Sequence, residues 1–114
     1  MKLACIVAVA VGVGIAASAA AAVAQDANVA KGMQVYTDQK CSLCHSVADK
    51  GNKKGPLDKV GSTLSADEIR QWIVNAKEMS EKTKATRTPP MKTFTLPSDQ
   101  VDALVAYLQS LKKR

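Results

Sequence analysis

Residues 41–45 read Cys41-Ser42-Leu43-Cys44-His45, a CxxCH pentapeptide, which is the sequence pattern of covalent c-type haem attachment. Positions i, i+3 and i+4 of a helical turn share one face, so both sulfur atoms and the imidazole can point at one flat object. We interpret that object as a porphyrin, with thioether links from Cys41 and Cys44 and with His45 as the proximal iron ligand. The pentapeptide therefore predicts one covalently bound haem c with its iron.

Two other cysteine chemistries fit these residues less well. A thioredoxin-like redox motif needs alternating strands and helices, and no β-branched strand pattern flanks Cys41 and Cys44. A structural zinc site needs four ligands, but the chain has no second cluster of cysteine and histidine, and His45 is its single histidine. Haem attachment is the interpretation that uses all three side chains.

The first 24 residues have the pattern of a secretory signal peptide. One positive charge precedes a long apolar run that ends in Ala22-Val23-Ala24, a small-x-small sequence typical of a cleavage site. We therefore expect a signal peptide over residues 1–24, cleavage between Ala24 and Gln25, and a periplasmic protein without stable membrane insertion. Export is consistent with haem attachment, which takes place outside the cytoplasm.

Two alternatives for this segment stay open. An uncleaved apolar run of about 20 residues is long enough to span a bilayer, and Cys5 suggests a lipoprotein. However, Cys5 precedes the apolar run instead of ending it, and no positively charged stop-transfer flank follows Ala24. Cleavage is therefore the preferred prediction.

The expected mature domain, residues 25–114, is small and basic. The chain has 114 residues and a formal net charge of +6, so removal of residues 1–24, with one lysine and no acidic residue, leaves 90 residues and a charge of +5. Both remaining cysteines are needed for haem, so no structural disulfide is expected. The aromatic residues are too few to fill the core of such a domain, and we expect the porphyrin to fill it. They are Tyr36, Trp72, Phe94 and Tyr107.

The basic character limits the choice of partners. An exported protein is an improbable nucleic-acid binder, and no aromatic residues alternate with the basic ones. The scattered lysines form either an ordinary solvated surface or a docking face for acidic redox proteins. We expect redox partner proteins, no nucleic acid, and a monomer. These lysines include Lys40, Lys50, Lys53, Lys54, Lys59, Lys77, Lys82, Lys84 and Lys92.

Helical periodicity predicts a helix before the haem motif. It should cover residues 28–40, with Asp26 as a cap near its start. Its apolar stripe at i, i+3, i+4 and i+7 spacing consists of Val29, Gly32, Met33 and Tyr36. The helix should lead directly into the haem motif.

Two further helices are predicted after the haem motif. One begins after the capping box Ser65-Ala66-Asp67-Glu68 and should end near Met79. The other has Ser98 as its expected cap and ends in a basic tripeptide that suits a helix C-terminus. Its apolar face consists of Val101, Leu104, Val105, Leu108 and Leu111.

Glycine and proline interrupt the chain between these helices. Residues 49–64 and 83–97 are predicted loops, because the former contains three glycines and a proline and the latter three prolines. The sequence therefore predicts an all-α domain with about three main helices and long loops around one covalently bound haem.

Methionine is the residue to consider as a second iron ligand. Met33 lies on the first helix stripe, where it should pack in the core on the side of His45, and Met79 could contact the haem rim. Met91 follows Pro89-Pro90, whose fixed φ angles keep the segment extended and present the next side chain with little entropy to lose. Met91 is therefore the expected distal ligand.

The ordered set of motifs resembles the class I cytochrome c family, and in particular its small bacterial exported monohaem members. The resemblance covers residues 27–112. It implies the class I fold around the haem, with Pro56 and Trp72 among the haem-binding residues. The motifs are Gly32 and Tyr36 before the pentapeptide, then Gly55-Pro56-Leu57, Trp72-Ile73-Val74-Asn75, Pro90-Met91 and Leu104-Val105-Ala106-Tyr107-Leu108.

The resemblance also implies specific contacts. Gly32 should let the first and last helices cross closely, with Tyr36 and Tyr107 near the crossing. The carbonyl of Pro56 should accept the Nδ1 hydrogen of His45, which would orient the imidazole and make it a better donor to iron.

The expected function is that of a one-electron carrier that alternates between ferric and ferrous iron and is not an enzyme. Methionine sulfur favours ferrous iron, and apolar residues such as Leu57, Ile73 and Phe94 should keep water away from it. Because Met91 lies in a loop, a haem sensor or peroxidase-like protein with a displaceable distal ligand stays open. A membrane-tethered subunit of a respiratory complex is a further alternative.

Overall fold

The computed structural model describes residues 16–112, and the side chains of residues 24–112. The first 15 residues of the expected signal peptide lie outside the described residues. The helix α1 (Ala16–Asp38) is followed by the 3₁₀ turn η1 (Cys41–Leu43) and by two short antiparallel strands, β1 (Ser46–Val47) and β2 (Lys50–Gly51). Four helices complete the order: α2 (Val60–Thr63), α3 (Ala66–Val74), α4 (Ala76–Thr83) and α5 (Ser98–Ser110). The predicted all-α fold is thereby confirmed.

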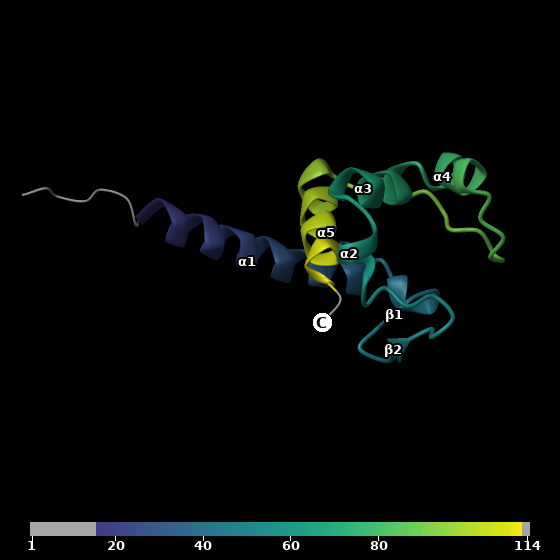
Figure 1. Ribbon diagram of the computed structural model, residues 1–114, viewed down its shortest axis with the longest axis horizontal. Helices are drawn as coiled ribbons and strands as arrows, with labels where there is room; N and C mark the ends of the chain where they lie inside the picture. Colours follow the sequence, from purple (N-terminus) through teal and green to yellow (C-terminus); the bar gives the residue numbers. More distant parts are fainter. Residues whose placement is uncertain (1–15, 113–114) are drawn as a thin grey trace, which may run out of the picture.

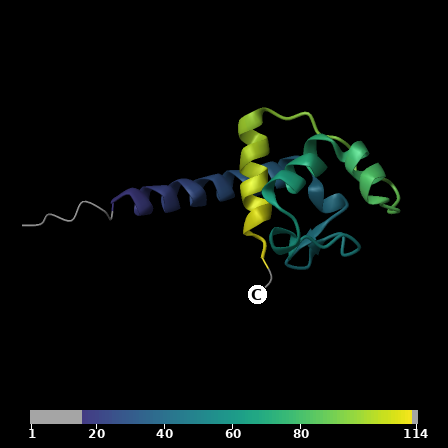
Figure 2. The same cartoon turned by 45° about the horizontal axis from the view of Figure 1, so that its top comes forward.

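The helices α1 and α5 cross at Gly32 and form the centre of the molecule (Figures 1 and 2). A Cβ atom on Gly32 would overlap the carbonyl group of Ala103 and lie 2.6 Å from the Cβ atom of Tyr107, so this approach requires glycine. The rings of Tyr36 and Tyr107 pack edge to face beside the crossing, with centroids 5.6 Å apart. The crossing and its two tyrosines therefore agree with the arrangement that the resemblance implied.

The buried core lies where α3 packs against these two helices. Two of its side chains come from α3, and most of the others come from α5. The apolar stripe predicted for α5 is thus buried, apart from Leu111, which lies just beyond the helix and is half-buried. The largest members of the core are Val35, Tyr36, Ile69, Ile73, Val101, Leu104, Val105, Tyr107 and Leu108.

The first helix differs from the prediction at both ends. It begins upstream of Asn28, passes through the expected cleavage point, and ends at Asp38. Asp26 is therefore an internal residue and not a cap, because the alanine-rich residues before it are strong helix formers. Met33 was also wrongly assigned to the core: its side chain is 54% exposed, and Val35 is buried instead. In both views, the N-terminal part of α1 extends away from the other elements (Figures 1 and 2).

The second predicted helix consists of two helices. The capping box is confirmed, with Ser65 and Glu68 each accepting a hydrogen bond from the backbone of the other. At Asn75 the backbone leaves helical geometry, with φ −135° and ψ 43°, so α3 ends there and α4 begins. Asparagine favours such breaks because its side chain competes for hydrogen bonds, and Asn75 Nδ2 donates to Gln71 Oε1 at 2.6 Å. The chain therefore turns before Met79, at which a single helix was expected to end.

Two further local predictions need correction. Pro97, and not Ser98, occupies the N-cap position of α5, and its carbonyl accepts hydrogen bonds from the backbone of Gln100 and Val101. The side chain of Ser98 makes no capping bond. The predicted loop 49–64 contains β2 and α2, and each of these short elements includes one of its glycines, Gly51 in β2 and Gly61 in α2.

None of the helices in residues 16–112 combines the length and the apolar character that crossing a membrane requires.

Candidate haem site

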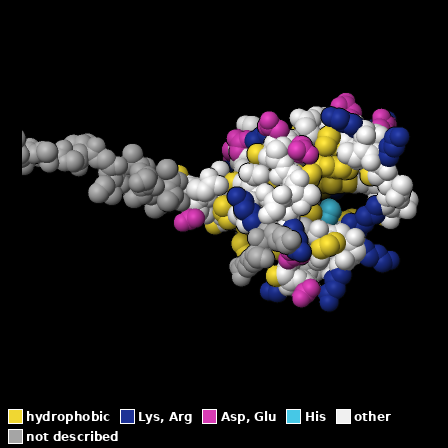
Figure 3. All heavy atoms as spheres, viewed as in Figure 1, with side chains coloured by type: hydrophobic (Ala, Val, Ile, Leu, Met, Phe, Trp, Pro, Cys, Tyr) yellow, Lys and Arg dark blue, Asp and Glu magenta, His cyan; other side chains and the backbone are white. Residues whose placement is uncertain are grey.

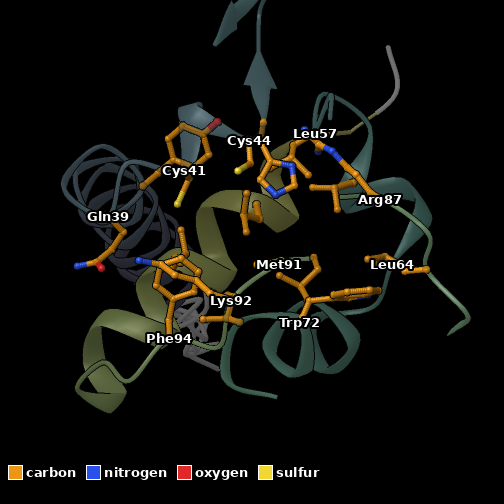
Figure 4. Close-up of a pocket in the computed structure, with 18 of the residues that line it drawn as sticks. Gln39, Cys41, Cys44, Leu57, Leu64, Trp72, Arg87, Met91, Lys92 and Phe94 are labelled. Carbon is orange, nitrogen blue, oxygen red and sulfur yellow. The ribbon is translucent and has the colours of Figure 1, made fainter. Parts of the chain in front are cut away.

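A cavity of about 950 Å³ lies between the CxxCH segment and the segment that carries Met91. Its volume is at the upper end of the range for small-molecule and cofactor sites, about 300–1,000 Å³. In Figure 3 the histidine, coloured cyan, is visible in a hollow with hydrophobic side chains above it and with lysine and arginine side chains near its rim. The close-up in Figure 4 shows Cys44 and Leu57 along one wall and Met91 and Trp72 along the facing wall.

The CxxCH pentapeptide forms the compact turn that its spacing predicts. Lys40 lies between α1 and η1 and has left-handed backbone angles, and η1 begins at the next residue, Cys41. The carbonyl of Cys41 accepts hydrogen bonds from the backbone N–H groups of Cys44 at 3.1 Å and His45 at 2.9 Å. Cys41, Cys44 and His45 all line the cavity. Burial raises the pKa of the Cys41 thiol, so in the free chain this side chain is protonated at neutral pH.

The orientation of His45 is determined by a hydrogen bond to the neighbouring loop. Its Nδ1 atom lies 3.0 Å from the carbonyl oxygen of Gly55. Because a carbonyl can only accept, Nδ1 carries the hydrogen and Nε2 of the neutral ring has a free lone pair for a metal. The prediction that Pro56 supplies this carbonyl is wrong by one residue. The carbonyl of Gly55 points toward the ring and also accepts the backbone hydrogen of Ser46, whereas Pro56 lines the cavity wall.

The protonation state of His45 suits metal binding. Burial lowers the pKa of the imidazole below its usual range, and the nearby charge of Arg87 acts in the same direction. The hydrogen bond to Gly55 opposes both effects without cancelling them. The ring is therefore neutral at physiological pH, as an iron ligand must be.

Asn52 connects the pentapeptide to the following loop, and sequence reasoning did not single it out. Its backbone N–H donates to the carbonyls of Ser42 and His45, each at 3.0 Å, and its side-chain amide donates to Leu43 at 3.2 Å. It follows Gly51, whose φ of 105° turns the chain back toward the motif. The Gly-Asn pair is a turn signal, but its hydrogen-bond partners depend on the fold. This network makes the histidine side of the cavity rigid without a ligand.

Of the three methionines in residues 16–112, Met91 is the one that lines the cavity. Met79 lies on α4 outside the cavity wall, and Met33 lies on the exposed face of α1. A thioether is thus available opposite the wall that carries Cys44 (Figure 4). The preference for Met91 over the other two methionines agrees with this geometry.

The segment between α4 and α5 follows an extended path. Ala85 donates to Ser80 at 2.9 Å at its start, and Phe94 donates to the carbonyl of Ile73 at 2.9 Å near its end. Among the described residues, 86–93 make no hydrogen bond with other parts of the chain. We call residues 84–94 the methionine segment, and its position over the cavity depends on these two attachments and on side-chain packing.

The rest of the wall is mostly apolar, as a porphyrin site requires. Trp72 and Ile73 come from α3, Leu57 precedes α2, and Phe94 ends the methionine segment. All four residues line the cavity. Tyr36 lies in the same wall beside Cys41 and is 8% exposed, and its buried hydroxyl group has no hydrogen-bond partner among the described residues.

Arg87 is a second feature of the cavity that sequence reasoning missed. It lies in the methionine segment, yet its guanidinium group reaches the loop on the histidine side, where a Cβ atom on Gly55 would overlap Nη1. Arg87 is exposed, as basic side chains in loops usually are, and no local pattern predicts its contact with Gly55. Its position depends on the contact between two distant parts of the chain.

The residues present fit a haem c. Two thiols and a neutral imidazole lie on one compact turn, a thioether faces them across an apolar cavity, and a glycine accommodates a cation at its edge. Searches among curated proteins and among solved structures found no match. Residues 29–112 match the family described as Cytochrome c, whose members carry covalently attached haem c. The match covers every element from the second half of α1 to the end of α5. The chain therefore belongs to the cytochrome c family, and it is a haem-binding electron-transfer protein.

Proposed function

We propose that this protein is an exported monohaem one-electron carrier with His45 and Met91 as the axial ligands. The observation that carries the proposal is the placement of Met91 in the cavity wall opposite the wall of the CxxCH turn. A haem with histidine and methionine ligands has its potential raised by the sulfur and has no vacant position for a substrate. The protein would then transfer electrons without making or breaking a bond, and so would not be an enzyme.

Each part of the site has a distinct task in this proposal. The bound haem supplies the redox chemistry, by cycling between ferric and ferrous iron. The hydrogen bond from His45 Nδ1 to Gly55 keeps the imidazole in one orientation in both oxidation states. Leu57, Ile73 and Phe94 exclude water from the cavity, which limits the solvent rearrangement that accompanies electron transfer.

We further propose that the partners are redox proteins with acidic docking surfaces. Lys40, Lys59 and Lys92 line the cavity, and Figure 3 shows lysine and arginine side chains near the rim of the hollow. Opposite charge on a partner increases the rate of encounter more than the affinity, and the increase is screened by salt. The rate at which an acidic partner reduces the protein should therefore fall as ionic strength rises. We also propose that the protein acts as a monomer.

The ligand assignment is tested by absorption spectroscopy of the ferric protein. Methionine bound to ferric haem gives a weak red absorption band, and Met91→Ala should abolish it. Met79→Ala is the matched control, because Met79 is a partly buried methionine outside the cavity wall, and it should retain the band. Loss of the band in Met79→Ala with retention in Met91→Ala would refute the assignment.

The lack of hydrogen bonds at residues 86–93 supports a second candidate function. In that case Met91 would leave the iron on demand, and the protein would sense or activate a small ligand. Carbon monoxide distinguishes the two functions. The ferrous carrier should give no carbon monoxide adduct at neutral pH, whereas a sensor or peroxidase-like protein should bind it with native Met91 present.

Export and cleavage after Ala24 complete the proposal. The small-x-small sequence Ala22-Val23-Ala24 supports them. The mass of the haem-loaded protein from periplasmic extracts should correspond to a chain that begins at Gln25. A mass that includes residues 1–24, found in the membrane fraction, would favour the tethered alternative.

A further inference from the structure

The guanidinium group of Arg87 lies at the edge of the haem cavity without an anionic partner. It reaches across from the methionine segment to Gly55, whose backbone also orients His45. The two ion pairs in the described part of the chain join Lys31 to Asp99 and Arg70 to Asp102, and no hydrogen bond there uses the guanidinium group. The interaction that Arg87 does make is with His45, which is not an anion.

The cavity wall itself is cationic. Lys40, Lys59, Arg87 and Lys92 line it, and no aspartate or glutamate is among its residues. Such a wall favours an anionic group on whatever fills the cavity. Among these four side chains, Arg87 has the planar fork of donors that matches a carboxylate in two hydrogen bonds. Lys92 is already placed over the ring of Phe94, with Nζ 4.9 Å from its centroid.

The position of Arg87 relative to the cysteines agrees with the chemistry of haem. The vinyl groups that form the thioethers and the two propionate carboxylates lie on different pyrrole rings. In Figure 4 Cys41 lies at one side of the cavity, and Arg87 and Leu64 lie at the other. A porphyrin tied to Cys41 and Cys44 has its carboxylates available for the side of the cavity away from Cys41.

We propose that Arg87 pairs with a propionate of the haem at the Gly55 edge of the cavity, and thereby holds the methionine segment over the iron. Arg87 is a positioning residue in this scheme, because it acts on the iron through Met91. The contact would attach the middle of a segment whose hydrogen bonds lie only at its ends, at Lys84, Ala85 and Phe94. The proposal rests on the proposed function only in its second half, which requires Met91 as a ligand.

Gly55 has a specific part in this arrangement. A Cβ atom at this position would overlap Nη1 and lie 3.0 Å from Cζ of Arg87. The same Cβ atom would also overlap the carbonyl oxygen of Cys44, so glycine lets both this carbonyl and the guanidinium group lie against the backbone that holds His45. Gly55 therefore contacts both walls of the cavity. Its carbonyl accepts the hydrogen bond of His45, and its lack of a side chain leaves room for Arg87 of the methionine segment.

The test compares Arg87→Gln, Arg87→Lys and Lys82→Gln in the haem-loaded protein. Lys82 is an exposed lysine on α4 outside the cavity wall, so its replacement removes the same charge without removing the contact. The first measurement is a titration of the ferric protein with imidazole, which competes with methionine for the iron. Because an ion pair between exposed groups is weak, Arg87→Gln should bind imidazole about two- to fivefold more tightly. Arg87→Lys should be intermediate, and Lys82→Gln should match the unmodified protein.

The second measurement is the pH dependence of the reduction potential, which does not require a methionine ligand. A nearby guanidinium group lowers the pKa of a carboxyl group. Arg87→Gln should therefore raise the pKa of the propionate. The pH range over which the reduction potential changes should then lie higher than in the unmodified protein. This measurement reports on the contact even if the distal ligand is another residue.

The outcomes separate the two proposals. If the unmodified protein lacks the methionine band but Arg87→Gln shifts the pH dependence of the potential, the axial assignment fails and the Arg87 contact stands. If Arg87→Gln and Lys82→Gln behave alike in both titrations, the contact is refuted. Arg87→Lys decides the question if Arg87→Gln does not retain haem, because a shift in its pH dependence supports the contact and its absence refutes it.

Discussion

The two segments that face each other across the haem cavity are stabilised by different means. On the histidine side, hydrogen bonds connect residues 42–46 to residues 52–57, with Asn52 and Gly55 at their centre. The methionine segment has backbone hydrogen bonds at Lys84 and Ala85 at its start and at Phe94 at its end, and none over residues 86–93. The first segment is organised by the chain itself, whereas the second depends on what it packs against.

This difference suits an electron carrier that must mature before it functions. Cys41, Cys44 and His45 have to be presented together when haem is attached, and the turn that presents them forms from local hydrogen bonds. The methionine segment can remain open until the porphyrin provides an apolar surface and, at Arg87, an anionic partner. Segments with few hydrogen bonds and few buried contacts are those that open most readily.

Hydrogen exchange should show the largest difference between the two segments. In the oxidised haem-loaded protein, the amides of Ser46, Asn52, Gly55 and Leu57 should exchange at least about 100-fold more slowly than those of residues 86–88, because they are hydrogen-bonded and the latter are not. Mass spectrometry of peptides from each segment measures both. Equal exchange rates in the two segments would contradict the difference in hydrogen bonding between the histidine side and the methionine segment.

Gly51→Ala should destabilise the histidine side. Gly51 has φ 105°, and a Cβ atom there would overlap the carbonyl of His45 and lie 3.0 Å from that of Ser42. We expect a loss of about 1–3 kcal/mol in the free energy of unfolding, measured by guanidinium titration. The control is Thr93→Ala, an exposed position in the methionine segment, which should change this free energy by less than about 0.5 kcal/mol. Similar losses of unfolding free energy in Gly51→Ala and Thr93→Ala would contradict the view that the histidine side depends on its own backbone geometry and the methionine segment does not.

Tyr36→Phe should alter the dependence of stability on alkaline pH. Burial is the main cause that raises the pKa of Tyr36 from 10.0 to about 12, so the folded state favours the neutral phenol. The stabilisation is complete below pH 10 and is lost as the pH rises through about 12. The variant should lose less stability than the native protein over this interval, and at pH 7 it should be at least as stable, because it lacks an unpaired buried hydroxyl.

The comparison uses denaturant unfolding of both proteins at several pH values. Tyr107, whose pKa is also raised by burial, is present in both and cancels in the difference. Parallel pH profiles would indicate that Tyr36 does not titrate differently in the folded state. Such a result would mean that the wall beside Cys41 is less closed than its burial indicates.

Ser65→Ala should have the smallest effect on stability. It acts on α3, the helix to which Phe94 of the methionine segment is hydrogen-bonded through Ile73. The Ser65 hydroxyl accepts the backbone hydrogen of Glu68 at 3.2 Å and caps α3. Its loss should cost about 1 kcal/mol in unfolding free energy, measured by thermal unfolding. Ser98→Ala is the matched control, because Ser98 makes no capping bond and its replacement should have almost no effect. Equal losses would contradict the assignment of Pro97 as the cap of α5.

Predictions from local signals were accurate where a few neighbouring residues determine the structure. The pentapeptide predicted a helical turn with three side chains on one face, and the Ser65 capping box predicted the start of α3. The turn and the cap require no knowledge of distant parts of the chain. The crossing at Gly32 joins distant residues, and it was predicted by the resemblance and not by a local signal.

Element boundaries were less predictable. The alanines before Asp26 extend α1 further than the apolar stripe indicated, and Asn75 interrupts a stripe that continues into α4. A periodic pattern shows which face is buried, but it does not exclude a single residue that leaves helical geometry. Competing caps, such as Pro97 and Ser98, differ too little in their local signal to be distinguished.

The sequence by itself determined the cofactor chemistry and the all-α class, and it led to the proposal of Met91 as distal ligand, because each depends on residue type and short spacing. Only the tertiary structure determined that Gly55 orients His45, that Asn52 connects the motif to the next loop, and that Arg87 crosses the cavity edge. These contacts join segments that are distant along the chain. They exist because α1, α3 and α5 pack together and leave a cavity between the segments they position.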